Sequence, residues 1–382
     1  MLTDVLRAAF YIPMPEGHKG APVLLWGRSG IGKTAVARAA ANACGLYHYR
    51  LAPSERGEGQ FGVVPVPGSD GYLHYPPPVW AQDVDARPSL LFLDEVDSVP
   101  LALQPPLLGM VQLRILGSHQ FAKSTRVMAA ANGVTGTWEL RPDILNRFCH
   151  LEFEGYSAEE WTGALLGGFA AEATTGANTA ADIEARVDAA WPGAVAKARG
   201  MVSGFITRRP ELLDKRPAKG STDRAFPTPR TCEYASLAIA AADVHGLSES
   251  DADTLIAGFV GLGWVSEYRK WSLDADLPDP AAFLDGKAKF VHDHRRLDRT
   301  LAHLGACAAT IIPEKSVRRQ DRGEVLVKFL DTLMEDAADL VVPVARQIIK
   351  AGAIKMGANS AWVKLGGGKN RILDMLTAAG LR

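Results

Sequence analysis

A glycine-rich segment of eight residues places the strongest constraint on the fold of this 382-residue chain. The segment is Gly27-Arg28-Ser29-Gly30-Ile31-Gly32-Lys33-Thr34; an apolar run precedes it at residues 23–26 and a helical pattern follows at residues 35–44. It fits G-x-x-x-x-G-K-[ST], in which glycines let backbone N–H groups wrap around phosphate oxygens. In such a loop Lys33 would reach the terminal phosphates and Thr34 would offer a hydroxyl to Mg²⁺. We therefore expect a strand, a phosphate-binding loop and a helix in this order.

The surrounding sequence predicts a mostly parallel α/β sheet. Between residues 21 and 153, short apolar runs alternate with helical patterns, which is typical of strands joined by crossover helices. The expected strands are residues 23–26, 46–51, 90–94 and 126–131. After residue 156 Ala-rich helical patterns predominate, and helices are expected at residues 159–171, 180–199, 231–244 and 251–270. A linker is expected at residues 212–229.

Two carboxylates end the third expected strand. Asp94 and Glu95 follow the apolar run at residues 90–93, at the carboxyl edge of the sheet where open α/β folds bind ligands. Asp94 would hold Mg²⁺ through water, and Glu95 is the candidate general base for an attacking water molecule. Taken alone, the pair could equally cap a helix; the phosphate loop upstream favours the catalytic interpretation.

Asn132 and Arg147 are further candidates, and each has a simpler alternative. Asn132 ends the expected strand at residues 126–131 and could reach a terminal phosphate or the attacking water, but Asn before Gly133 is also a common turn residue. Arg147 could form a surface ion pair or could reach the nucleotide of a neighbouring subunit as an arginine finger. Residue chemistry alone leaves both questions open.

These motifs, in this order, resemble the AAA+ ATPases, and in detail the MoxR-like group with its dynein-related core. The resemblance extends over residues 22–284 and implies a P-loop NTPase core with a helical lid domain. It identifies residues 27–34 as Walker A, Asp94 and Glu95 as Walker B, and Asn132 as sensor 1. The resemblance also identifies Arg147 as the arginine finger, for which Arg141 is a poorer match. It identifies residues 225–230 as the sensor 2 motif, with Arg230 as the sensor 2 arginine. A helix cap is the simpler explanation of residues 225–230.

The expected domains are an α/β nucleotide-binding core at residues 1–155, a helical lid at 156–284 and a helical C-terminal extension at 285–382. The extension lies outside the resemblance and is basic, with 17 Lys and Arg against 10 Asp and Glu from residue 287 onward. Arg318, Arg319, Arg322 and Lys328, with Lys364, Lys369 and Arg371 of the tail, could contact phosphate backbones or an acidic partner, although a solvated helical face is the simpler interpretation.

The segment at residues 54–80 is rich in Gly and Pro and interrupts the α/β order. It lies where the related ATPases present a pore loop or a substrate-engaging insertion. Phe61 and Tyr72 are its candidate contacts, but an aromatic side chain in such a loop more often packs on its own domain.

Composition narrows the location and the partners. The chain carries 42 Lys and Arg against 43 Asp and Glu, so no overall field directs it to nucleic acid or to a membrane. No transmembrane segment or signal peptide is expected, and the four widely separated cysteines are expected to be buried thiols, which favours the cytoplasm. The resemblance implies a homo-oligomeric ring, most often a hexamer in this family. It also implies that the ring uses hydrolysis of Mg-ATP to remodel a partner protein. By the same resemblance, that partner often carries a von Willebrand factor A domain. A DNA remodeller is the alternative, and a nucleotide-gated scaffold is disfavoured because a scaffold has no need of Glu95.

Overall fold

The computed structural model describes residues 2–53, 65–99, 103–133, 140–167, 179–218, 223–315, 318–334 and 336–352. The chain forms two compact units that interleave along the sequence. The first unit comprises Met1–Arg186, Arg216–Pro227 and His245–Leu262, and the second comprises Val187–Lys215, Thr228–Val244 and Gly263–Arg382. The expected domain boundaries after residues 155 and 284 stay predictions.

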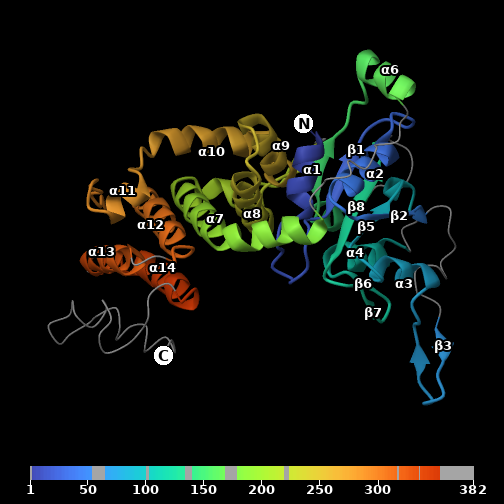
Figure 1. The fold of residues 1–382 in the computed structure, drawn as a ribbon, viewed down its shortest axis with the longest axis horizontal. Helices are drawn as coiled ribbons and strands as arrows, with labels where there is room; N and C mark the ends of the chain where they lie inside the picture. Colours follow the sequence, from blue (N-terminus) through green and yellow to red (C-terminus); the bar gives the residue numbers. More distant parts are fainter. Residues whose placement is uncertain are drawn as a thin grey trace. The chain divides into compact units, whose positions relative to one another are not determined.

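A five-stranded parallel sheet forms the centre of the first unit, with the strand order β2-β5-β8-β1-β9 (Figure 1). The strands are β1 Val23–Trp26, β2 Tyr47–Leu51, β5 Ser89–Leu93, β8 Thr125–Ala131 and β9 Cys149–Glu152. Every residue of β5 and β8 is buried, as expected for central strands of a parallel sheet that is covered on both faces. The four predicted strands are confirmed to within one residue, and the predicted α/β class is confirmed.

Sequence analysis did not predict β9, which pairs with β1 at the edge of the sheet. The strand carries His150, and the ring of this residue is satisfied by two hydrogen bonds. Trp26 Nε1 donates to Nδ1 at 2.9 Å, and Nε2 lies 2.9 Å from the carbonyl oxygen of Leu145. Burial lowers the pKa of His150 to about 4, so the ring is neutral at pH 7. These bonds let a polar residue occupy a half-buried strand position.

Helices pack on the sheet and extend the first unit. They are α1 Leu2–Phe10, α2 Lys33–Ala43, α3 Val79–Asp85, α4 Gln104–Gln112, α5 Pro142–Leu145, α6 Ala158–Gly167 and α9 Glu249–Val260. Trp80 of α3 and Met110 of α4 are buried in one apolar cluster with Leu93 and Val127 of the sheet. This packing fixes the strands whose carboxyl ends carry the candidate site.

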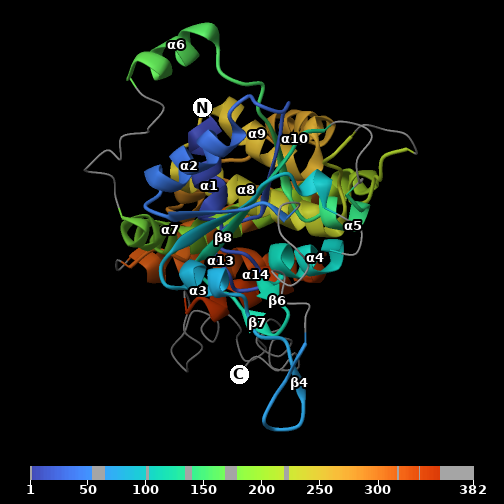
Figure 2. The same ribbon diagram turned by 90° about the vertical axis from the view of Figure 1, so that its right-hand side faces the viewer.

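Two small antiparallel hairpins leave the sheet of the first unit. One joins β3 Val66–Pro67 to β4 Leu73–His74, and the other joins β6 Ile115–Leu116 to β7 His119–Gln120. Figures 1 and 2 show that the β3–β4 hairpin projects away from the five-stranded sheet, below α3. Tyr72 therefore lies on a projecting hairpin, whereas Phe61 lies outside the described residues.

Two predicted helices need correction. The helix expected at residues 251–270 is two helices, α9 and α10 Leu262–Asp274, because Gly261 at φ 82° stands in a backbone conformation that ends a right-handed helix. The helix expected at residues 180–199 continues as α7 Ala180–Arg208, and its final turns bury Val202 and Phe205. Of the helix expected at residues 159–171, the structure describes α6, and residues 168–171 lie outside the described part.

The second unit is helical. It contains most of α7, followed by η5 Pro210–Leu212, α8 Pro229–His245, α10, α11 Pro280–Leu284, α12 Leu297–Ile311, α13 Arg318–Leu333 and α14 Ala338–Lys350. Helices α7 and α12 approach closely at Gly200 and Gly305. A Cβ atom at Gly200 would lie 2.7 Å from the Cα atom of Gly305, so a side chain there would separate the two helices.

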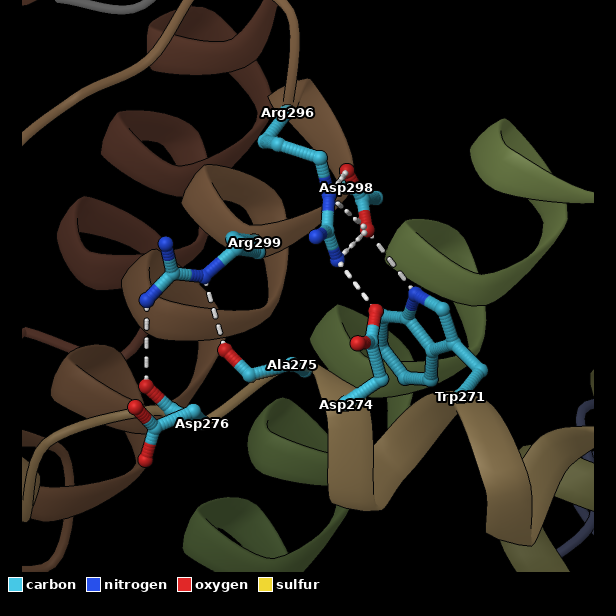
Figure 3. A network of polar contacts seen from close by, with 7 residues as sticks. All are labelled: Trp271, Asp274, Ala275, Asp276, Arg296, Asp298 and Arg299. Carbon is cyan, nitrogen blue, oxygen red and sulfur yellow. Dashed lines mark hydrogen bonds and ion pairs between the residues drawn. The ribbon is translucent and has the colours of Figure 1, made fainter.

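A polar network joins the end of α10 to the start of α12 within the second unit (Figure 3). Asp298 is buried; its carboxylate accepts hydrogen bonds from Trp271 Nε1 at 2.9 Å and from the guanidinium of Arg296 at 3.0 Å. Arg296 also bonds Asp274 at 3.2 Å, and Arg299 Nε donates to the carbonyl oxygen of Ala275 at 2.7 Å. Burial alone would raise the pKa of Asp298, but the bonds from Arg296 and Trp271 outweigh it and lower the pKa.

The four cysteines are free and buried, as predicted, and burial raises the pKa of the Cys44 and Cys307 thiols to about 12. Within the ranges that the structure describes, every helix is too short or too polar to traverse a lipid bilayer.

Candidate active site

The glycine-rich segment forms the turn between β1 and α2, and two of its glycines are required by the space around them. A Cβ atom at Gly27 would lie 2.5 Å from the carbonyl oxygen of Phe153. Gly32 immediately precedes α2 at φ 104°, and a Cβ atom there would lie 2.9 Å from the ring of Tyr156. The segment therefore closes onto the residues that follow β9, and α2 begins at Lys33 with its N-terminal N–H groups directed toward the loop.

Lys33 is buried inside this turn. Its ammonium group donates to the carbonyl oxygens of Gly27 at 2.7 Å and Arg28 at 3.0 Å, and to Oδ1 of Asn132 at 2.8 Å. Three acceptors match the three donors of an ammonium group. Burial lowers the pKa of Lys33, and the negative charges of Asp94, Asp97 and Glu95 oppose this effect.

Asp94 lies directly after β5 and is buried. Its backbone N–H donates to the carbonyl oxygen of Leu51 at 2.8 Å, which holds it at the carboxyl edge of the sheet. Its Oδ2 atom accepts hydrogen bonds from Thr34 Oγ1 at 3.2 Å and from Arg50 Nε at 2.7 Å. A carboxylate and a hydroxyl at this distance are the oxygen donors that suit Mg²⁺, so the donor set fits the predicted metal.

Glu95 follows with an unusual backbone. Its φ of 55° and ψ of 46° place it in the left-handed region, which few residues other than glycine adopt. The conformation turns the chain from β5 into the short helix η3 Val96–Ser98. Strained residues of this kind concentrate at functional sites, because the surrounding structure must hold them in place.

A cavity of about 730 Å³ lies over these residues. It is lined by Ser29, Gly30, Gly32, Lys33, Thr34, Ala35, Arg38, Ala39, Asn42, Arg50, Asp94, Glu95 and Asn132. The structure thus brings together the predicted residues from the ends of β1, β5 and β8. Of the predicted segment, Gly27 and Arg28 direct carbonyl groups at Lys33, and Ile31 packs beside Gly27 and Gly155.

Asp97 holds Asn132 in position, and sequence analysis did not identify it. The buried carboxylate of Asp97 accepts hydrogen bonds from the backbone N–H groups of Asn132 at 2.7 Å and Gly133 at 3.2 Å. These bonds tie η3 to the end of β8. The sequence shows Asp97 two residues after Glu95. Its bonds to Asn132 and Gly133 form only because β5 pairs with β8, which the local sequence does not reveal.

Arg147 is outside the cavity of its own chain. Its Nε donates to Oε1 of Gln112 at 2.6 Å, and its Nη1 donates to the carbonyl oxygen of Asp143. Arg141 forms a pair of bonds with the exposed carboxylate of Asp143. Arg147 is therefore fixed by α4 and α5, and its role as an arginine finger stays a prediction.

Arg230 belongs to the second unit, in the first turn of α8. Thr228 and Thr231 cap this turn reciprocally: Thr231 N donates to Thr228 Oγ1 at 3.2 Å, and Thr228 N donates to Thr231 Oγ1 at 2.8 Å. The capping expected for residues 225–230 is present. The sensor 2 role of Arg230 stays a prediction.

The arrangement combines cationic, acidic and amide groups in one open cavity. Lys33 and the N-terminus of α2 supply positive potential for phosphates, Asp94 and Thr34 supply metal-binding oxygens, and Glu95 supplies a carboxylate beside them. This set of groups is suited to breaking a phosphoanhydride bond.

A family model that matches part of the chain agrees with this chemistry. Residues 23–154 match the model of the ATPase family associated with various cellular activities (AAA). The comparison with curated proteins found no match. Among solved structures, the chain is similar to a "putative ATPase" from Cytophaga hutchinsonii ATCC 33406, with 14% identity and a TM-score of 0.43 over 70% of this chain and 84% of that chain. The matched family model spans the loop, both carboxylates and Asn132, so residues 23–154 are similar to the ATPase domain that this model describes.

Proposed function

We propose that this protein is a ring-forming motor of the MoxR-like group, which couples hydrolysis of Mg-ATP to remodelling of a partner protein in the cytoplasm. The observation that carries the proposal is the cavity of about 730 Å³, in which Lys33, Thr34, Asp94, Glu95 and Asn132 converge from three strand ends. A cavity of this volume is in the range that binds small molecules of nucleotide size.

The nucleotide would bind through its phosphates. The backbone N–H groups of the glycine-rich turn and the ammonium group of Lys33 would contact phosphate oxygens, with the positive end of α2 directed at the same place. Asp94 and Thr34 would hold Mg²⁺, which when bound supplies positive charge that offsets the charge of the phosphates.

Glu95 would then act as the general base. It would orient a water molecule toward the terminal phosphorus atom and accept its proton as the new P–O bond forms. The bond between this phosphorus atom and the bridging oxygen of the nucleoside diphosphate breaks, which releases ADP and phosphate. The side-chain amide of Asn132 would contact the terminal phosphate or the attacking water, held in place by Asp97.

Ring assembly would complete the site. Arg147 lies outside the cavity of its own chain and is held by Gln112 and Asp143, so we assign it to the nucleotide of a neighbouring copy. An arginine supplied in this way can raise the rate by about 10³ to 10⁵. We also propose Arg230 as the sensor 2 arginine and a hexamer as the ring.

Exposed apolar side chains on the β3–β4 hairpin favour a protein as the binding partner. Tyr72 is 73% exposed and Leu73 is 62% exposed, and Val66 and Tyr75 add further exposed apolar surface. Residues 65–78 contain no Lys or Arg, which disfavours a phosphate backbone as the ligand of this hairpin. A partner with a von Willebrand factor A domain remains our proposal for the substrate class.

The alternative, a DNA remodeller, has weaker support. Arg322 of the basic stretch on α13 is bonded to Asp285 at 2.8 Å and to Glu314 at 3.2 Å, so part of its charge is neutralised within the second unit. Lys364, Lys369 and Arg371 lie outside the described residues.

The dependence of ATPase activity on protein concentration tests the proposed ring. Specific activity should rise with concentration as the ring assembles, and a candidate protein partner should stimulate it further. Activity that is independent of concentration would contradict a site shared between subunits. Stimulation by DNA with a steep salt dependence would favour the alternative.

A further inference from the structure

Arg50 is placed at the carboxyl edge of the sheet by strand pairing. It is the fourth residue of β2, and its backbone is in register with Phe92 of the adjacent strand β5. Asp94 follows two residues after Phe92. The pairing of β2 with β5 therefore brings Arg50 beside Asp94, and the two side chains meet with 2.7 Å between Nε and Oδ2.

Oδ2 of Asp94 accepts hydrogen bonds from both Arg50 and the hydroxyl group of Thr34. Thr34 Oγ1 lies 3.2 Å from the same Oδ2 atom. The two residues assigned to Mg²⁺ are thus bonded to each other, and a guanidinium group neutralises their carboxylate. A buried carboxylate needs such a counter-charge, and an arginine side chain is always cationic in proteins.

The side chain of Arg50 lies at the cavity and not in the apolar core of the unit. It lines the cavity together with Lys33, and 40% of it is exposed. By contrast, Arg114 and Arg126 in the same unit are fully buried and bonded to backbone carbonyl groups. Movement of Arg50 within the cavity would leave the apolar core of the unit packed.

We propose that Arg50 and Mg²⁺ compete for the carboxylate of Asp94, and that Arg50 moves to the terminal phosphate of a triphosphate when the metal binds. The proposal rests on the proposed function of this cavity. A divalent cation and a guanidinium group repel each other at one carboxylate oxygen, whereas the planar fork of the guanidinium matches phosphate oxygens. Arg50 would therefore distinguish a triphosphate from a diphosphate.

The test is a comparison of binding by calorimetry. ADP and a non-hydrolysable ATP analogue are titrated, with and without Mg²⁺, into wild type, Arg50→Ala and Arg50→Lys. Loss of a charge-assisted bond to the terminal phosphate should lower the ratio of ATP-analogue affinity to ADP affinity by roughly tenfold or more in Arg50→Ala with Mg²⁺ present. The ratio should be intermediate in Arg50→Lys. ADP binding to Arg50→Ala should reach half-saturation at a lower Mg²⁺ concentration, because Asp94 is no longer neutralised.

Arg87→Ala is the matched control. Arg87 is exposed and stacks on Tyr47 at the opposite end of β2, at 4.3 Å from the ring centroid. The substitution Arg87→Ala removes one arginine charge near β2 but outside the cavity. Its ratio of ATP-analogue affinity to ADP affinity should stay within about twofold of the wild-type ratio. Circular dichroism would verify that every variant is folded.

The outcomes separate the inference from the proposed function. An unchanged ratio in folded Arg50→Ala, or an equal loss of affinity for both nucleotides, would overturn the assignment of Arg50 while leaving the nucleotide site intact. Absence of binding of either nucleotide to wild type would overturn the proposed function and this inference with it.

Discussion

Lys33 Nζ donates a hydrogen bond to Oδ1 of Asn132 at 2.8 Å, joining two residues that are 99 positions apart in the sequence. With its bonds to Gly27 and Arg28, Lys33 has three protein acceptors, one for each of its donors. Phosphate oxygens must therefore replace some of these acceptors when the nucleotide binds. The strength of the bond to Asn132 should influence nucleotide affinity.

This relationship predicts different effects of two substitutions at Asn132. Asn132→Asp places a carboxylate beside Lys33 and the phosphates, and it should weaken binding of an ATP analogue by roughly tenfold or more. Asn132→Ala releases Lys33 and should bind the analogue at least as well as wild type, but with slower turnover. Calorimetry and steady-state ATPase assays measure the two effects. Tighter binding in Asn132→Asp than in Asn132→Ala would be inconsistent with competition for Lys33.

Removal of the general base should separate binding from hydrolysis. Glu95→Gln keeps the size of the side chain but cannot accept the proton, so turnover should fall by about 10² to 10⁴ while ATP binding is retained. Glu154→Gln makes the same change at an exposed residue after β9 and should leave turnover unchanged. Wild-type turnover in Glu95→Gln would show that another group activates water.

Mixed assemblies test the position of Arg147. Arg147→Ala should bind ATP but lose hydrolysis, because the neighbouring site lacks its arginine. Addition of Lys33→Ala subunits, which cannot bind nucleotide but still donate Arg147, should restore activity in the mixture. Gln112→Ala should reduce activity less, since Asp143 still holds the guanidinium. Failure of rescue at every mixing ratio would place Arg147 in its own subunit's chemistry.

The Asp298 network predicts a pH-dependent contribution to stability. The pKa of Asp298 is lowered below its ordinary value of 3.8, so the charged form stabilises the folded state above that pH. Asp298→Asn should reduce the free energy of local unfolding of α12 by about 3 kcal/mol at pH 7. The difference from wild type should disappear as the pH falls through the folded pKa. Hydrogen exchange of α12 amides would measure it.

Arg295→Ala is the control for this network, because Arg295 is exposed and adjacent to Arg296. It should change the free energy of α12 opening by no more than about 0.5 kcal/mol. A difference between wild type and Asp298→Asn that stays constant as the pH is lowered from 7 to well below 3.8 would argue against a role of the charge.

Local patterns were sufficient to predict the strands that form the site. β1, β5 and β8 are buried on both faces and therefore appear in the sequence as continuous apolar runs. In β9, the polar residues His150 and Glu152 alternate with Cys149 and Leu151, so the strand has no continuous apolar run. The ring of His150 is bonded to Trp26, 124 positions away, and no local pattern reveals that partner.

The same distinction applies to the site. Lys33, Thr34, Asp94 and Glu95 stand at the ends of apolar runs, and parallel strands bring such ends to one edge of a sheet. Arg50 and Asp97 were not predicted, because their importance depends on which strands are neighbours. The order β2-β5-β8 places Arg50 beside Asp94 and Asp97 beside Asn132, and this order is a property of the whole fold.

The nucleotide site itself is tested by calorimetric titration of an ATP analogue with Mg²⁺ into wild type and Lys33→Ala. Wild type should show saturable binding at one site per chain, and a folded Lys33→Ala variant should show no measurable binding. Equal affinity in the two proteins would contradict the assignment of the glycine-rich turn and its cavity to the nucleotide.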